Sequence, residues 1–288
     1  WERIDPVRVY APLYIDRGPA LLSSTARLHE QGGAAVRTGG VQTEFESLRE
    51  YRQGDAFRTL NWRASARRGH LVVNEYQSER TQQVMIVLDA GRLMVPEYRG
   101  IARFEYALSA ALQLGRLAAS RDDRVGMMAF GAQVDLLLPP GRGQAQISRL
   151  AEAASLVQPQ MVEPDYAGAL ARLSGSLKRR SLVLFFTDFV SPGASRTLVE
   201  HLLRLVPRHL PVVMAISDPA LGELARAESA ITIAGAYSTA AADWALEERA
   251  AARATLAQRG IPVLDVPPLA LATSAINKYL AIKRQGLL

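Results

Sequence analysis

From residue 84 onward, short apolar runs alternate with segments in which apolar residues recur every three or four positions. Residues 84–88 and 182–186 are the most hydrophobic runs, and each has the length of one buried strand. Strands that alternate with amphipathic helices form a mostly parallel sheet, because a return to a parallel neighbour needs a crossover of about a dozen residues. The sequence therefore predicts an α/β domain of Rossmann type over residues 81–288, with helices on both faces of its sheet.

One pair of strands departs from this parallel arrangement. Residues 125–130 and 134–138 are both apolar, but only three residues separate them, which is too short for a helical crossover. We therefore expect one antiparallel edge strand at 134–138. The first 80 residues show no such alternation, and we expect them to form an N-terminal extension packed on the main domain. Further helices are expected at about residues 101–121, 147–154, 166–177, 198–205, 240–258 and 269–283.

Composition limits the chemistry that is open to this chain. The 288 residues include no cysteine, which excludes disulfides, thiol catalysis and cysteine-bound zinc. Basic residues number 34 against 28 acidic ones, and the net charge of +6 informs mainly on solubility and nonspecific binding. No apolar run approaches the ~18–20 residues that span a bilayer. The chain begins with Trp1 instead of methionine, so we expect a further segment upstream, and any membrane attachment would lie there.

Both of the most hydrophobic strands end in a carboxylate, Asp89 after the first and Asp188 after the second. In an open α/β sheet, ligands bind outside the carboxyl ends of the strands. If the two strands are neighbours, the two carboxylates converge, and their repulsion favours a cation, an arginine or a proton between them. Alternatively, Asp89 pairs with Arg92 or caps the next helix, and Asp188 caps the helix that follows it.

The order of these elements resembles the von Willebrand factor A fold, whose first strand ends in D-x-S-x-S and whose later strand ends in T-D. In that fold these residues, with a threonine from an intervening loop, form a magnesium site. Here Gly91 and Leu93 stand at the two serine positions and offer no side-chain oxygen, while Asp165 is the oxygen donor of the loop at 163–166. The resemblance implies a degenerate metal-ion-dependent adhesion site for Mg²⁺ or Mn²⁺. Its candidate ligands are Asp89, Asp165 and Asp188, and its loop residues are Gly91, Arg92 and Thr187.

Arginine is concentrated between residues 48 and 80, where seven guanidinium groups lie near aromatic and acidic residues. Because a guanidinium stays charged, each one needs an acid, a partner molecule or water. The segment fits the long pattern R-x-Y-x-x-G-D-x-x-R-x-L-x-W-x-A-x-A-R, and on that pattern the chain resembles the DUF58 family. The matching residues are Arg49, Tyr51, Gly54, Asp55, Arg58, Leu60, Trp62, Ala64, Ala66 and Arg67, and Glu75 continues the resemblance.

DUF58 proteins are bacterial proteins with a von Willebrand A-like domain, and they are commonly encoded beside AAA+ ATPases of the MoxR type. The resemblance implies a non-enzymatic interaction module without catalytic residues. Such a module would be an adaptor or partner of the ATPase, or of its client protein, in the assembly or maturation of complexes. Relatives carry transmembrane helices before this region, so the resemblance also implies a domain at the cytoplasmic face of the inner membrane.

Two roles for the arginines stay open. In the first, Arg49, Arg58 and Arg67 form a buried network with acids such as Asp55 and Glu75, and this network braces the segment. In the second, exposed arginines and the tryptophan bind a protein, because these residue types dominate interface hot spots. We expect Trp62 on an extended segment, facing the same side as the leucine two residues before it.

Two further functions are alternatives to the interaction module. A divalent-metal-dependent hydrolase of phosphate esters would use Asp89, Asp165 and Asp188, but the four histidines have no metal-binding spacing and no general base is evident. Nucleic-acid binding would use the arginines around Trp62, but acidic residues interrupt the positive charge. We therefore expect no nucleic-acid partner.

Overall fold

The computed structural model describes residues 43–51, 60–78, 81–188, 192–226 and 233–287. These residues fall into two compact units, and each is described here by itself. The first contains the described residues up to 81, and the second contains those from 82 onward.

The first unit is a β-hairpin with a short helix between its strands. Strand β1 (Thr43–Glu50) pairs antiparallel with β2 (Val72–Ser78), and α2 (Trp62–Arg68) lies between them in the chain. The side chain of Asn61 caps α2 by accepting from the amide of Ala64 (2.9 Å), and Gly69 ends the helix with a φ of 71°. The prediction of an extended segment around Trp62 is therefore wrong, because Asn61 caps a helix at that point.

The second unit is built on a six-stranded sheet with the order β10-β9-β8-β3-β6-β7. Its neighbours run parallel except β6 and β7, which pair antiparallel at one edge, so the prediction of a mostly parallel sheet with an antiparallel edge strand is confirmed. The strands are β3 (Gln83–Asp89), β6 (Arg124–Phe130), β7 (Val134–Gly141), β8 (Leu182–Thr187), β9 (Leu210–Ile216) and β10 (Val263–Val266). Two short strands, β4 (Glu97–Tyr98) and β5 (Ile101–Ala102), form a separate hairpin.

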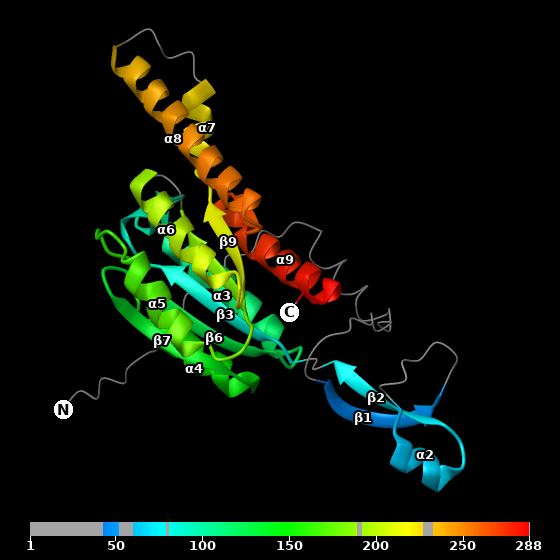
Figure 1. Ribbon diagram of the computed structural model, residues 1–288. Coiled ribbons are helices and arrows are strands. Elements are labelled where there is room, and N and C mark those ends of the chain that lie inside the picture. The colour runs from blue at the N-terminus through cyan, green and yellow to red at the C-terminus, as the bar shows by residue number, and fades with distance from the viewer. Residues whose placement is uncertain (1–42, 52–59, 79–80, 189–191, 227–232, 288) are drawn as a thin grey trace, which may run out of the picture. The chain divides into compact units, whose positions relative to one another are not determined.

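Helices cover both faces of this sheet (Figure 1), as predicted. Alternate residues of β3 face opposite layers: Ile86 belongs to the core under α3, α4 and α9, and Val87 belongs to the core under α5, α6 and the second half of α8. The helices are α3 (Arg103–Ala119), α4 (Gly143–Ala154), α5 (Tyr166–Ser176), α6 (Pro192–Leu205), α7 (Pro219–Arg226), α8 (Ile233–Gln258) and α9 (Leu271–Gln285), with single turns η2 (Arg92–Met94) and η3 (Pro268–Ala270).

Helices α7 and α8 differ from the expected pattern. The sequence analysis did not anticipate α7, and α8 begins at Ile233, earlier than the expected residue 240. Figure 1 shows α7 and the first half of α8 side by side, extending beyond the sheet. Within the described part of the chain, no helix combines the length and the hydrophobicity that crossing a bilayer requires.

His209 lies just before β9 and is almost completely buried, with 2% of its surface exposed. Neither of its ring nitrogens has a hydrogen-bond partner among the described residues. Burial lowers the pKa of His209, and the nearby charges of Arg208 and Arg180 lower it further. The folded protein therefore favours the neutral imidazole at this position.

This burial predicts a loss of stability in acid. Because the pKa of His209 is lower in the folded protein than its unfolded value of 6.5, the unfolded chain binds the proton more readily as the pH falls below that value. Each unit of difference corresponds to about 1.4 kcal/mol. We expect His209→Leu to reduce the difference in unfolding free energy between about pH 8 and about pH 5, measured by urea denaturation. His201→Gln is the control, because it removes a histidine of α6 that is only partly buried. An unchanged pH dependence in His209→Leu would contradict the argument.

Candidate functional site at the carboxyl ends of β3 and β8

Asp89 and Asp188 lie at the same edge of the sheet. Their strands β3 and β8 are parallel neighbours, with Leu88 opposite Phe186, and each carboxylate stands at or just after the end of its strand. Both residues are buried, with 0% and 2% of their surface exposed. Two carboxylates in a buried site repel each other unless protein donors or cations stabilise them.

Hydrogen bonds from three neighbouring groups hold the carboxylate of Asp89. Its Oδ1 accepts from the amide of Gly91 (2.8 Å), and its Oδ2 accepts from the hydroxyls of Thr187 (2.7 Å) and Tyr166 (2.8 Å). Burial raises the pKa of Asp89; the bonds from Thr187, Gly91 and Tyr166 oppose that shift, and the charge of Asp188 adds to it. Burial and the charge of Asp89 also raise the pKa of Tyr166, so the phenol keeps its proton and remains a donor.

Two buried arginines meet the carboxylate of Asp188. Arg103 at the start of α3 donates from Nη1 to Oδ2 (2.6 Å), and Arg249 of α8 donates from Nη1 to Oδ1. The exposed fractions of the two arginine side chains are 8% and 4%, and that of the Asp188 side chain is 0%. Both oxygens of this carboxylate therefore accept charged hydrogen bonds away from water.

Each of these arginines also binds a second acid. The Nη2 of Arg103 donates to Asp218 just after β9 (2.6 Å), and the Nη2 of Arg249 donates to Asp265 of β10 (2.6 Å) and to the carbonyl of Ile216 (3.1 Å). Burial disfavours the charged form of Arg249, but the two acids outweigh it and raise the pKa of the guanidinium. We call this set the aspartate–arginine chain; it consists of Asp218, Arg103, Asp188, Arg249 and Asp265.

The loop that contains Asp165 lies against the loop after β3. The amide of Gln160 donates to the carbonyl of Ala90 (2.8 Å), and the amide of Arg92 donates to the carbonyl of Val162 (2.9 Å). Pro164 covers Gly91 so closely that a Cβ at that glycine would lie 2.8 Å from the proline Cδ. A serine at this position would therefore collide with the loop.

Asp165 does not join the two strand-end carboxylates in a common set of metal ligands. It is exposed and caps α5, where its Oδ1 accepts from the amide of Gly168 (2.9 Å). Arg92 pairs with Glu163 (2.5 Å), so the alternative pairing of Arg92 with Asp89 is wrong. Asp188 binds the two arginines described above.

The residues at this edge do not fit Mg²⁺ or Mn²⁺. Magnesium demands near-octahedral oxygen ligands, but the oxygens of Asp89 and Asp188 already accept hydrogen bonds from protein donors. Gly91 and Leu93 supply no side-chain oxygen. Across the described residues, no group of three or more histidines, aspartates or glutamates is arranged to hold a metal ion. The same geometry leaves the alternative hydrolase without its set of three carboxylates.

The residues of the arginine-rich signature are only partly described. Arg49 lies in β1 opposite Val73, Glu75 lies in β2 opposite Ser47, and the amide of Tyr51 donates to the carbonyl of Leu71 (2.9 Å). Gly54, Asp55 and Arg58 lie outside the described residues. On α2, Trp62 has 67% of its surface exposed and Arg67 is also exposed, so of the two roles left open for Arg67 the buried brace does not fit.

The sequence analysis missed the two arginines that bind Asp188. Arg249 had a signal that could have revealed it, because it lies on the buried stripe of α8 that Ala245, Ala252 and Leu256 define. An arginine on such a stripe needs a buried acid. Arg103 is the first residue of the apolar helix α3 and carries no comparable signal.

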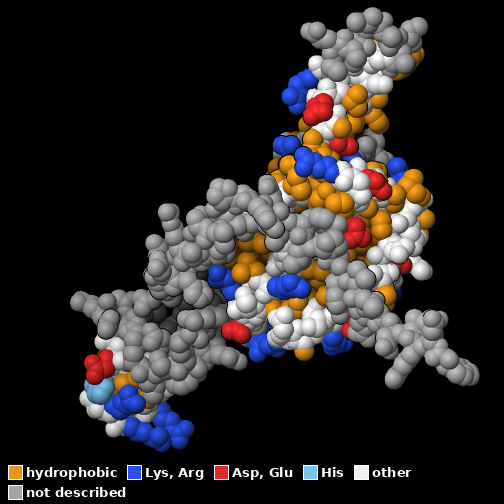
Figure 2. Space-filling model, turned by 180° about the vertical axis from the view of Figure 1, so that it is seen from behind, with side chains coloured by type: hydrophobic (Ala, Val, Ile, Leu, Met, Phe, Trp, Pro, Cys, Tyr) orange, Lys and Arg blue, Asp and Glu red, His pale blue; other side chains and the backbone are white. Residues whose placement is uncertain are grey.

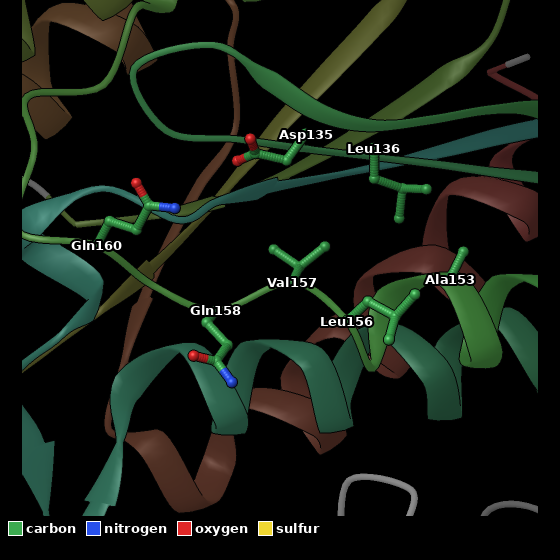
Figure 3. A pocket seen from close by; sticks show the side chains of 7 residues that line it. All are labelled: Asp135, Leu136, Ala153, Leu156, Val157, Gln158 and Gln160. Carbon is green, nitrogen blue, oxygen red and sulfur yellow. The ribbon is translucent and has the colours of Figure 1, made fainter. Parts of the chain in front are cut away.

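A cavity of about 310 Å³ lies elsewhere, between β7 and the loop that follows α4 (Figure 3). Leu136 and Val157 give it apolar walls, and Asp135, Gln158 and Gln160 add polar groups. Neither Asp89 nor Asp188 lines this cavity. The cavity and the strand-end carboxylates are therefore separate features of the second unit.

Comparison with known proteins gives both a family and individual relatives. The model of the family described as "Protein of unknown function DUF58" matches residues 47–255. The uncharacterized proteins Mb1516 of Mycobacterium bovis and Rv1480 of Mycobacterium tuberculosis are each 26% identical to this chain over 264 residues. Those alignments cover 86% of this chain and 82% of each relative.

Three solved structures are similar at low sequence identity. An aerotolerance-related membrane protein from Bacteroides fragilis has 16% identity and a TM-score of 0.45, covering 69% of this chain and 98% of that one. The conserved hypothetical protein BatB from Bacteroides thetaiotaomicron has 13% identity and a TM-score of 0.44, covering 71% and 99%. The SpRpn10 VWA domain has 14% identity and a TM-score of 0.41, covering 69% and 95%.

The first prediction at this site concerns Asp188. Replacing it with asparagine removes the charge between two buried guanidiniums, and breaking a buried ion pair in this way costs about 3 kcal/mol. We expect Asp188→Asn to lower the free energy of unfolding by about that amount, measured by chemical denaturation. Asp165→Asn is the matched control and should be nearly neutral, because asparagine caps a helix as well as aspartate does. Equal stability of the two variants would show that the arginines do not depend on Asp188.

The second prediction concerns Gly91. If Pro164 leaves no room for a side chain there, Gly91→Ser will destabilise the protein by about 1–3 kcal/mol, as overpacking of a filled interior does. The double variant Gly91→Ser with Pro164→Ala should recover part of this loss, measured by thermal unfolding. If Gly91→Ser alone is as stable as the wild type, the loop that contains Pro164 moves aside without loss of stability, and the prediction is wrong.

Proposed function

Because this chain belongs to the DUF58 family, whose function is unknown, we propose that it works as a protein-interaction module. The membership confirms the resemblance carried by the arginine-rich segment. Our proposal for the partner is more specific: an AAA+ ATPase of the MoxR type, a client protein of that ATPase, or both.

The observation that carries the proposal is the exposed face of α2. Trp62 has 67% of its surface exposed, and Arg63, Ala66 and Arg67 on the same helix are also exposed. Residues four positions apart lie on one face of a helix, so Trp62 lies beside Ala66, and Arg63 lies beside Arg67. Figure 2 shows basic side chains gathered over α2. Tryptophan and arginine are the residues that most often dominate interface energy.

This face is held by a fixed scaffold, which favours binding. The hydroxyl of Ser65 donates to the carbonyl of Asn61 (2.8 Å) and accepts from the amide of Val72 (2.9 Å), so it ties the helix to β2. The helix also has the Asn61 cap at one end and the Gly69 turn at the other. A preorganised helix loses less conformational entropy on binding than a loop would. An acidic surface with an apolar pocket for the indole would complement it.

The chemistry at the strand ends also supports a binding role over a hydrolytic one. The carboxylates that a hydrolase would need are engaged by hydroxyls, an amide and two guanidiniums. Placement at the cytoplasmic face of the inner membrane is part of the same proposal, since a MoxR-type ATPase works in the cytoplasm. We propose no nucleic-acid partner.

The test is a binding measurement with a purified MoxR-type ATPase in its ATP-bound, ADP-bound and nucleotide-free states. We expect Trp62→Ala to weaken binding by roughly thirtyfold, the effect of removing a hot spot worth about 2 kcal/mol. Trp244→Ala is the matched control, because it removes another exposed tryptophan, from α8, with 53% of its surface exposed. Absence of binding in every nucleotide state, or equal losses in the two variants, would contradict the proposal.

A further inference from the structure

The carboxyl edge of the sheet carries its own positive charges. The aspartate–arginine chain contains three carboxylates and two guanidiniums, and Arg253 lies 3.5 Å from its outer member Asp265. These ion pairs join three carboxylates to three guanidiniums. Asp89 instead accepts from hydroxyl and amide donors.

We infer that Arg103 and Arg249 supply at this edge the positive charge that a magnesium ion supplies in the metal-binding form of the von Willebrand A fold, so that the edge is complete without metal. The donor set carries the inference: each oxygen of Asp188 receives a guanidinium hydrogen bond, and the arginine side chains are less than a tenth exposed. A cation that bound Asp188 would lie next to these two buried guanidiniums, whose positive charges would repel it.

Each guanidinium binds two acids at once through its planar fork, so Arg103 joins Asp188 to Asp218, and Arg249 joins Asp188 to Asp265. Because the two arginines come from α3 and α8, the charges also fasten both helices to the ends of β8, β9 and β10. The packing at Gly91 also agrees with an edge that holds no metal, because Pro164 occupies the space next to the loop after β3.

The experiment removes the guanidinium of Arg249 and asks whether a divalent metal ion can restore the lost stability. Thermal unfolding of the wild-type protein is measured in EDTA, in MgCl₂ and in MnCl₂, beside the variants Arg249→Met, Arg249→Lys, Asp188→Asn and Arg249→Met with Asp188→Asn. We expect the same melting temperature for the wild type under all three conditions. Arg249→Met should melt about 10 °C lower in EDTA, and Mn²⁺ should recover part of that loss because Asp188 then lacks one of its two guanidinium partners. The recovery should disappear when Asp188→Asn is added.

Arg249→Lys keeps the positive charge but loses the fork, so it should melt between the wild type and Arg249→Met and gain nothing from Mn²⁺. If Arg249→Met does not fold, the melting temperatures of Arg249→Lys and of the wild type in EDTA, MgCl₂ and MnCl₂ test the inference. The inference is overturned if Mn²⁺ or Mg²⁺ stabilises the wild type and Asp188→Asn abolishes that effect. It is equally overturned if Arg249→Met folds but loses no stability, or shows no recovery that depends on Asp188.

Discussion

A buried carboxylate needs hydrogen bonds and opposite charge to replace the water that it has lost. In the second unit, Asp188 is such a carboxylate. Removing an ion from water costs several kcal/mol, and this cost is met only where geometry and hydrogen bonds are good. Arg103 and Arg249 provide both, but each arginine then needs an acid of its own, which Asp218 and Asp265 supply. One buried charge at the end of β8 thus fixes contacts to β9, β10, α3 and α8.

The α/β layers could be predicted because they rest on a repeating property of the sequence. Residues of β3 are buried on both faces, which produces the uninterrupted apolar run from Val84 to Leu88, and the short link between β6 and β7 forces an antiparallel pair. The two-residue spacing of Leu60 and Trp62 indicated an extended segment. Asn61 between them is an N-cap residue type, and in the structure it starts the helix α2.

The site was harder to predict because its partners are distant in the chain. Asp188 and Arg249 are 61 residues apart, and Arg103 is 85 residues from Asp188. Periodicity places Arg249 on a buried stripe, but it cannot say which acid the arginine meets. The sequence analysis had recognised that converging carboxylates favour a cation, an arginine or a proton. Only the three-dimensional packing selects arginine at Asp188 and hydroxyl donors at Asp89.

The same residue type therefore has opposite uses in the two units. In the second unit, Arg103 and Arg249 are buried and their Nη donors bind acids of the same chain, which leaves little for a ligand to bind. On α2 they are exposed beside Trp62, where desolvating them is unfavourable unless a partner supplies acceptors. An interface at α2 would need acidic groups around a pocket for the indole, and it would weaken as salt screens those charges.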